Sequence, residues 1–111
     1  MSPFLTPHQE KTLAEKRPAY VIAEVEITDP AAFQDYVAQA VPTLAPYGGR
    51  IIANNPPDPK EGARPAGNIL IAMFDSLEDA QKWYHSAAYT PTIKMRQRAA
   101  NTRLFIVEGV P

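Results

Sequence analysis

Alternating apolar and polar residues mark the first regular element of the chain. From residue 19 to residue 27 every odd position is apolar, whereas the even positions are Tyr20, Ile22, Glu24 and Glu26. A period of two with one fully apolar side is typical of a β-strand that buries one face. We therefore expect a strand at 19–27.

A helical pattern follows this strand. Asp29 precedes Pro30, which is typical of a helix start, because the carboxylate caps free backbone N–H groups and proline has none to cap. Gly48-Gly49 is expected to end the helix, since glycine readily adopts the left-handed conformation. Apolar residues recur between these points at intervals of three and four, which predicts one buried stripe. They are Phe33, Tyr36, Val37, Ala40, Val41 and Leu44.

The second half of the chain repeats this succession. Short strands are predicted at 50–54 and 68–74, and the connector at 55–67 holds four prolines, which exclude regular structure. Ser76 is expected to cap a second helix, because its hydroxyl accepts a backbone N–H of the first turn. The remaining predicted elements are an interruption at 85–89, a helix that ends at Ala100 and a strand at 102–108. Thr90-Pro91 is expected to start this helix, with Thr90 as its cap and Pro91 at its first position.

The resulting order is strand, helix, strand, strand, helix, strand. This βαββαβ order is typical of a ferredoxin-like α+β domain, in which both helices cover one face of a four-stranded antiparallel sheet. We expect one such domain at residues 18–111. Residues 1–17 are polar, contain two prolines and are expected to form an N-terminal arm that is mobile or wraps around a partner subunit.

The second face of this sheet is too apolar to meet water. Tyr20 and Ile22 lie on it if the fully apolar side of the first strand meets the helices, and strands 68–74 and 102–108 are apolar on both sides. Large exposed apolar patches are rare on monomers. We therefore expect a homodimer in which two sheets face each other as a dimeric α+β barrel.

Composition narrows the possible functions. The 111 residues contain 11 Lys and Arg against 12 Asp and Glu, so the basic excess of a nucleic-acid binder is missing. There are no cysteines, which excludes thiolate metal sites and cysteine nucleophiles. No apolar run is long enough to cross a membrane. We expect a cytoplasmic protein with no membrane or nucleic-acid partner, no metal site and no cofactor.

One polar and aromatic segment is the first candidate for chemistry. Neutral imidazole exchanges protons near pH 7, so His85 is a candidate acid or base. An arginine fork matches a carboxylate through two hydrogen bonds, so Arg96 is a candidate anchor for an anionic ligand. The alternative is that Trp83 and Tyr84 belong to the core, that Ser86 caps the break and that both Arg96 and Arg98 are solvated. The remaining candidates here are Trp83, Tyr84, Ser86 and Tyr89.

A second group of candidates lies along the first two strands. Glu24 and Glu26 point the same way from one strand, and Arg103 is expected on the strand beside them. Either these charges pair at a dimer interface, or burial raises the pKa of Glu24 so that it acts as a base. Arg50 is expected to share a face with Ile52 and Asn54, and Tyr36 lies either in the core or in the same cleft.

Several stretches resemble the family catalogued as domain of unknown function 1330. The resemblance spans about residues 18–110 and implies a dimeric α+β barrel similar to small monooxygenases that act without a cofactor. Three features depart from the family pattern: His85, Ala87-Ala88 and a long connector at 56–65. The stretches that carry the resemblance include Tyr47-Gly48-Gly49-Arg50, Trp83-Tyr84-His85-Ser86-Ala87-Ala88-Tyr89 and Phe105-Ile106-Val107-Glu108-Gly109. The positions that match are Tyr36, Arg50, Trp83, Tyr84, Ser86, Tyr89 and Arg96.

We therefore expect each subunit to bind or transform a small organic anion, without a cofactor, in a pocket between helices and sheet. Glu24 and His85 are the candidate catalytic residues. The other seven candidates are expected to contact the ligand. The alternatives are a ligand-binding module without catalysis and a dimerisation module without a ligand.

Overall fold

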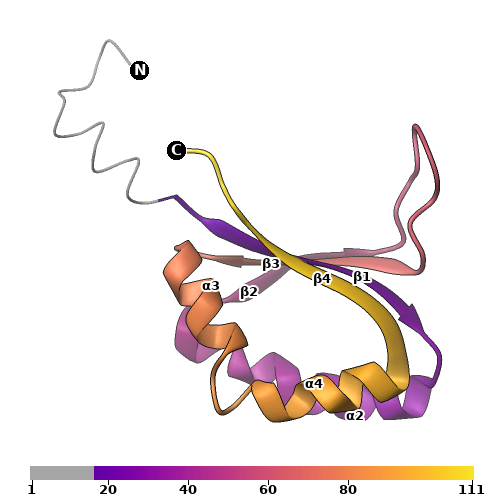
Figure 1. Cartoon of the computed structure of the whole chain (residues 1–111), viewed down its shortest axis with the longest axis horizontal. Coiled ribbons are helices and arrows are strands. Elements are labelled where there is room, and N and C mark those ends of the chain that lie inside the picture. The colour runs from indigo at the N-terminus through magenta and orange to yellow at the C-terminus, as the bar shows by residue number, and fades with distance from the viewer. Residues whose placement is uncertain (1–16) are drawn as a thin grey trace, which may run out of the picture.

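The computed structural model describes residues 17–111, which form one four-stranded antiparallel sheet with three α-helices (Figure 1). The strand order is β2-β3-β1-β4. This order and the element succession are those of a ferredoxin-like α+β fold, which confirms the predicted fold class. The strands are β1 (Ala19–Ile27), β2 (Arg50–Asn55), β3 (Asn68–Phe74) and β4 (Ala100–Glu108).

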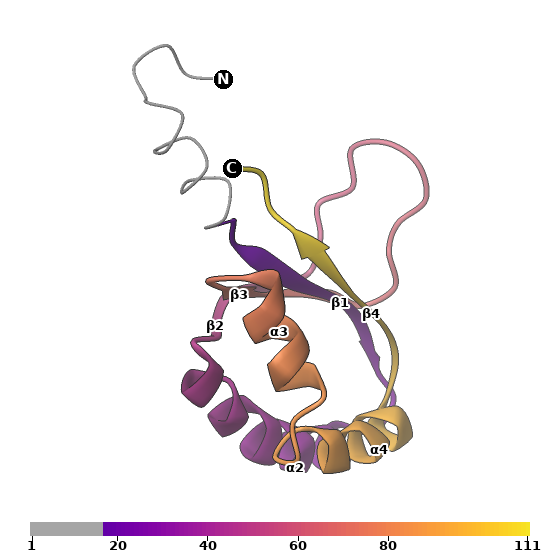
Figure 2. The ribbon, with the colours of Figure 1, turned by 60° about the vertical axis from the view of Figure 1, so that its left-hand side comes forward.

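Helices α2 (Pro30–Ala40), α3 (Leu77–Tyr84) and α4 (Thr90–Ala99) all lie on one side of the sheet (Figures 1 and 2). The caps predicted at Asp29 and Ser76 are confirmed. Asp29 accepts from the backbone N–H of Ala32 at 3.1 Å, and Ser76 accepts from that of Asp79 at 3.0 Å.

The first predicted helix is shorter than expected. Two 3₁₀ turns, Val41–Thr43 and Ala45–Tyr47, follow α2 where the apolar stripe predicts continuous α-helix. Pro42 and Pro46 lie in these turns, and each lacks the backbone N–H that an α-helical bond requires. The stop at Gly48 is confirmed, because this residue adopts a left-handed φ of 76°.

Two further boundaries differ from expectation. The backbone of Thr90 is already helical and Tyr89 is the N-cap, so Thr90 does not cap α4. Its hydroxyl instead donates to the Ser86 carbonyl at 3.0 Å. Strand β4 starts at Ala100, two residues before the predicted start, because residues 100 and 101 already pair with β1.

The two faces of the sheet have different surroundings. The odd residues of β1 pack against the helices, and their partners in β3 and β4 are Leu70, Ala72, Leu104 and Ile106. The opposite side, here called the open face, is covered by none of these three helices (Figure 2). The open face holds Tyr20, Ile22, Glu24, Ile69, Ile71, Met73, Arg103, Phe105 and Val107.

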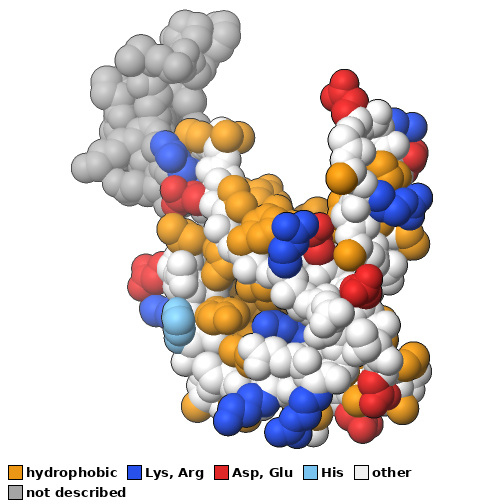
Figure 3. Space-filling model, turned by 45° about the vertical axis from the view of Figure 1, so that its right-hand side comes forward, with side chains coloured by type: hydrophobic (Ala, Val, Ile, Leu, Met, Phe, Trp, Pro, Cys, Tyr) orange, Lys and Arg blue, Asp and Glu red, His pale blue; other side chains and the backbone are white. Residues whose placement is uncertain are grey.

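The open face is apolar and partly exposed. Phe105 and Val107 expose 46% and 45% of their surface. The loop between β2 and β3 projects on this side, away from the helices (Figure 1). Figure 3 shows hydrophobic side chains gathered beside this loop. The predicted N-terminal arm lies outside the described residues except for Arg17, so the division into an arm and a domain stays a prediction.

A β-bulge in the edge strand β2 changes which face its residues occupy. Arg50 pairs with Met73 on the open face, and Ile51 pairs with Ala72 on the helix face. The register then shifts, and Asn54 pairs with Leu70, which faces the helices. The expectation that Arg50 and Asn54 share a face is therefore wrong, because one extra residue reverses the alternation.

Candidate functional site

A pocket of about 190 Å³ lies between the sheet and the helices. Its lining is almost entirely apolar and comes from both layers. Among the lining residues that the structure describes there is no Asp, Glu, His or Lys, and the one charged side chain is that of Arg96. The sheet contributes Val21, Ala23, Val25, Leu70, Ala72 and Leu104, and α2 and the turn after it contribute Phe33, Tyr36, Val37, Ala40 and Val41.

Three polar side chains meet in this apolar pocket. Arg96, which is 7% exposed, donates from Nη1 to the phenol oxygen of Tyr89 at 2.7 Å. The phenol oxygens of Tyr89 and Tyr36 are hydrogen-bonded to each other at 3.0 Å. Since the residues come from α4, from the turn before it and from α2, packing of the two helices assembles the group.

Arg96 lacks a carboxylate partner within the described part of the chain. None of the ion pairs within residues 17–111 involves it, and its buried Nε has no acceptor there. A buried cation is costly unless it is paired and hydrogen-bonded. The neutral phenol of Tyr89 satisfies only one of the five N–H donors of a guanidinium.

The protonation states of Arg96 and Tyr89 are fixed around neutral pH. Burial raises the pKa of Tyr89 well above its ordinary value of 10.0, Tyr36 raises it further, and Arg96 opposes the shift only in part. Burial lowers the pKa of Arg96, but the phenol groups of Tyr89 and Tyr36 raise it by more, so it ends above its ordinary value. The pocket therefore holds a permanent positive charge beside the neutral phenol of Tyr89.

Trp83 forms an aromatic wall of the pocket. Its ring centroid lies 4.0 Å from that of Tyr89 and 5.5 Å from that of Phe74. Its indole N–H donates to Thr43 Oγ1 at 2.9 Å, and Thr43 in turn donates to the carbonyl of Ala40 at 2.6 Å. This chain of hydrogen bonds fixes the ring relative to the end of α2.

Ser86 holds the break between α3 and α4. Its buried hydroxyl donates to the carbonyl of Trp83 at 2.7 Å and accepts from the backbone N–H of Tyr89 at 3.1 Å. Ser86 does not line the pocket, but it connects the two aromatic residues that do.

The pocket is open on the side where α2 faces the edge strand β2. Three lining residues remain exposed there: Val37 of α2 at 39%, Val41 of the turn after it at 41% and Ile51 of β2 at 39%. Ile27, at the end of β1, also lines the pocket and is 41% exposed. Asn54 lines the same side from β2, and Asn68 lines the pocket from the start of β3. The rim is therefore apolar with two amides.

Residues 18–110 match the family described as Domain of unknown function (DUF1330). The chain belongs to the DUF1330 family. This confirms the resemblance that the sequence carries. No curated protein sequence matches the chain.

Solved structures share the fold of this DUF1330 protein at low sequence identity. RPA0582, a protein of unknown function from Rhodopseudomonas palustris, is 16% identical over 96% of this chain and 95% of its own, with a TM-score of 0.65. SnoaB, a cofactor-independent oxygenase from Streptomyces nogalater, is 11% identical over 83% of this chain and 91% of its own, with a TM-score of 0.58. A putative antibiotic biosynthesis monooxygenase from Caulobacter crescentus is 11% identical over 94% of this chain and 100% of its own, with a TM-score of 0.55.

The DUF1330 domain brings together four of the nine predicted site residues. Tyr36, Trp83, Tyr89 and Arg96 all line the pocket. Tyr84 packs behind them, with its ring 6.3 Å from that of Trp83 and 5.9 Å from that of Tyr89. It contributes to the core and does not line the pocket.

The two candidate catalytic residues lie outside the pocket. Glu24 is on the open face, where its carboxylate forms an ion pair with Arg103 at 2.6 Å. One of the two sequence alternatives places this pairing at a dimer interface, and that location stays a prediction. His85 is exposed after α3, and its ring lies nearly perpendicular to that of Tyr84, with the two ring centroids 5.2 Å apart.

Arg50 also lies away from the pocket. It is exposed on the open face, and its Nη1 is 3.7 Å from Asp75 Oδ1. Its Nη2 donates to the sulfur of Met73 at 3.5 Å. The pocket and Arg50 are therefore on opposite sides of the sheet.

Two pocket contributors are not recognisable in the sequence as site residues. Asn54 reaches the helix face only because of the bulge in β2, which the alternation of residues does not reveal. Thr43 holds Trp83 from a 3₁₀ turn, where the sequence predicts α-helix. Within residues 17–111, no three His, Cys, Asp or Glu side chains gather closely enough to hold a metal ion, and no helix there is long and apolar enough to cross a membrane.

Proposed function

We propose that the pocket binds a small organic anion without a cofactor, and that Arg96 holds its charged group. The observation that supports this is the buried guanidinium without a carboxylate partner among residues 17–111, at an apolar pocket. An anion entering the pocket pairs with this charge, which Tyr89 alone satisfies incompletely. The apolar walls favour a ligand with an apolar body.

The single tryptophan of the chain makes this proposal directly testable. Trp83 lines the pocket, so its fluorescence reports an occupant without interference from other indoles. Titration with hexanoate, cyclohexanecarboxylate and benzoate is compared with titration by the corresponding neutral amides. We expect carboxylates to bind and their amides to bind at least tenfold more weakly.

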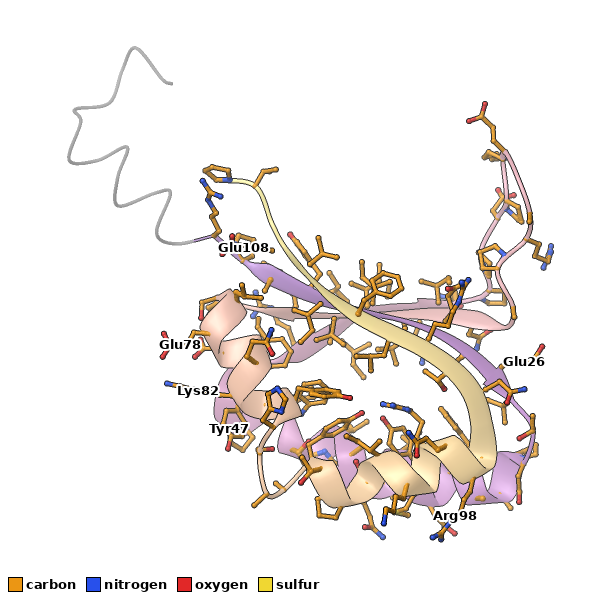
Figure 4. All side chains as sticks on the ribbon, in the orientation of Figure 1. Glu26, Tyr47, Glu78, Lys82, Arg98 and Glu108 are labelled. Atoms are coloured by element: carbon orange, nitrogen blue, oxygen red, sulfur yellow. The ribbon has the colours of Figure 1, made fainter. Side chains whose placement is uncertain are left out.

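Two arginine variants separate anion binding from stability. Arg96→Met keeps side-chain length but removes the charge, and we expect roughly a 10- to 150-fold loss of carboxylate affinity, as for a charged hydrogen bond. Arg98→Met is the matched control, since Arg98 is exposed on the outer side of α4, pointing away from the sheet (Figure 4). The proposal is wrong if no carboxylate binds, or if both variants bind carboxylates as the wild type does.

Catalysis is a second candidate. In favour of it, Arg96 and the phenols present hydrogen-bond donors to an oxyanion in a water-poor pocket. The fold is shared with SnoaB, a cofactor-independent oxygenase. Since the described lining holds no Asp, Glu, His or Lys, a substrate must reach the pocket already ionised or lose its proton without a side-chain base. Oxygen consumption by the protein with each anion that binds tests this candidate.

We infer further that a second copy of the chain covers the open face. Supporting this, the face is apolar and exposed at Phe105 and Val107, and the half-buried carboxylate of Glu24 is already paired with Arg103. The loop between β2 and β3 projects at one end of the sheet and leaves the centre of the face uncovered (Figure 1). A second sheet of the same kind fits against such a surface.

A further inference from the structure

We propose that the ligand is a single-ring aromatic monoanion bearing a neutral hydroxyl or carbonyl substituent, and that Asn54 recognises this substituent. This rests on the proposed anion binding at Arg96 and specifies the ligand. Three properties of the pocket carry it: its volume, its charge and the amides that line it.

The volume fits one ring. An engineered apolar cavity of about 150 Å³ binds benzene, whereas pockets for drug-sized ligands measure roughly 300–1,000 Å³. The pocket of this chain, about 190 Å³, therefore holds a benzene ring with one or two small substituents. A fused second ring would have to extend through the rim formed by Val37, Val41 and Ile51.

The walls favour an aromatic ring over an aliphatic chain. Phe33, Tyr36, Trp83 and Tyr89 all line the pocket, and these rings already pack in tilted pairs, with centroids 5.4 Å apart for Phe33 and Tyr36. Tilted and offset contacts between rings add stabilisation beyond that of buried area. A flat ligand ring continues this arrangement, which a flexible chain does not.

The charge of the lining selects a monoanion. Arg96 supplies one positive charge, and no other charged side chain among residues 17–111 lines the pocket. A dicarboxylate or a phosphate dianion would bring a second negative charge into an apolar site with no partner for it, which is costly. A single carboxylate matches the charge.

The β-bulge places a neutral polar group in the same pocket. Because the register shifts after Ile51, Asn54 lies opposite Leu70 and lines the pocket together with Asn68. Bulges next to binding sites often redirect a side chain in this way. An amide both donates and accepts, so it pairs with a hydroxyl or a carbonyl, but not with a bare ring edge.

The experiment compares benzoate, 3-hydroxybenzoate, 4-hydroxybenzoate and 2-naphthoate by Trp83 fluorescence. The variant Asn54→Leu is tested against Asn55→Leu, because Asn55 pairs with Ile69 on the open face and does not line the pocket. In the wild type we expect at least one hydroxybenzoate to bind about 2- to 12-fold more tightly than benzoate, as for one neutral hydrogen bond. Asn54→Leu should remove this difference, and Asn55→Leu should retain it.

The outcomes distinguish this inference from the proposed function. If naphthoate or hexanoate binds as tightly as benzoate, or if Asn54→Leu keeps the preference for the hydroxyl group, the ligand class is wrong. Anion binding at Arg96 then still stands, provided that Arg96→Met weakens binding of these carboxylates. If no carboxylate binds at all, the proposed function itself fails.

Discussion

Replacing Ser86 by alanine tests whether the break between α3 and α4 positions the aromatic wall of the pocket. In Ser86→Ala the backbone N–H of Tyr89 loses its acceptor, the Ser86 hydroxyl at 3.1 Å. The carbonyl of Trp83 loses one donor but keeps the backbone N–H of Ser86, also at 3.1 Å. The change therefore leaves one buried donor unpaired.

The size of the effect follows from this count. A buried donor without an acceptor costs about 1–3 kcal/mol of unfolding free energy. In a domain of roughly this size each kcal/mol lowers Tm by about 4–8 °C. We therefore expect Ser86→Ala to lower Tm by about 4 °C or more, measured by circular dichroism. Because Trp83 and Tyr89 lose their common anchor, we also expect weaker carboxylate binding and a shifted Trp83 emission.

Ser76→Ala is the matched control. Ser76 also accepts one backbone N–H, that of Asp79 at 3.0 Å, but at the far end of α3 and outside the pocket. Losing such a cap costs about 1 kcal/mol. We expect Ser76→Ala to lower Tm while Trp83 emission and carboxylate affinity stay those of the wild type. If Ser86→Ala also leaves affinity within twofold of the wild type, Ser86 has no positioning role.

Three further predictions follow from single contacts. Ile22→Lys places a charge on the open face and should convert a dimer to a monomer in light scattering at micromolar concentration. Glu78→Lys, on the exposed side of α3 (Figure 4), should leave the dimer intact, and a monomeric wild type contradicts the inferred dimer. Thr43→Val should leave the indole N–H of buried Trp83 without its acceptor, shift the Trp83 emission and cost about 1–3 kcal/mol of unfolding free energy; unchanged emission contradicts the assigned bond. The pKa of Tyr89 is raised in the folded state, so above about pH 10 the unfolded chain releases this proton while the folded chain keeps it, and the unfolding free energy falls. Tyr89→Phe should therefore flatten this fall between pH 9 and about 11 in urea titrations, and equal slopes contradict the reasoning.

The strands at 19–27 and 68–74 are predicted to the residue. In the first, period-two alternation separates a buried from a partly exposed side, and in the second, turn residues bound a continuous apolar run. The helix expected through Leu44 is different, because its apolar stripe continues through Pro42 although the backbone hydrogen bonds do not. The spacing of apolar residues indicates which side of a segment is buried. Over so short a stretch, α-helical and 3₁₀ turns bury much the same positions, so the spacing does not distinguish them.

The candidate site is less predictable from the sequence than the fold. Arg50 and Arg96 look equally suitable as anchors, because each lies near aromatic residues and glycine or proline turns. Their difference is tertiary: α4 packs against α2 and buries Arg96, whereas Arg50 starts an edge strand and stays exposed. Likewise, nothing in the alternation at 50–55 indicates the bulge that turns Asn54 to the pocket.

Arg103 and Arg96 differ in burial and in the group that faces their charge, and this difference supports a ligand at Arg96. Arg103 lies on the open face with an exposed side chain and a carboxylate 2.6 Å away, so its charge is already neutralised by Glu24. Arg96 lies on the other side of the sheet, is almost fully buried and hydrogen-bonds a neutral phenol in place of a carboxylate. A chain under selection for stability alone gains little from the second arrangement, since an apolar residue in a buried position of this kind is often as stable or more so. Arg96→Met should therefore leave Tm unchanged or raise it, and a Tm that falls by several degrees, without any anion that shifts it, assigns Arg96 to the structure and not to a ligand.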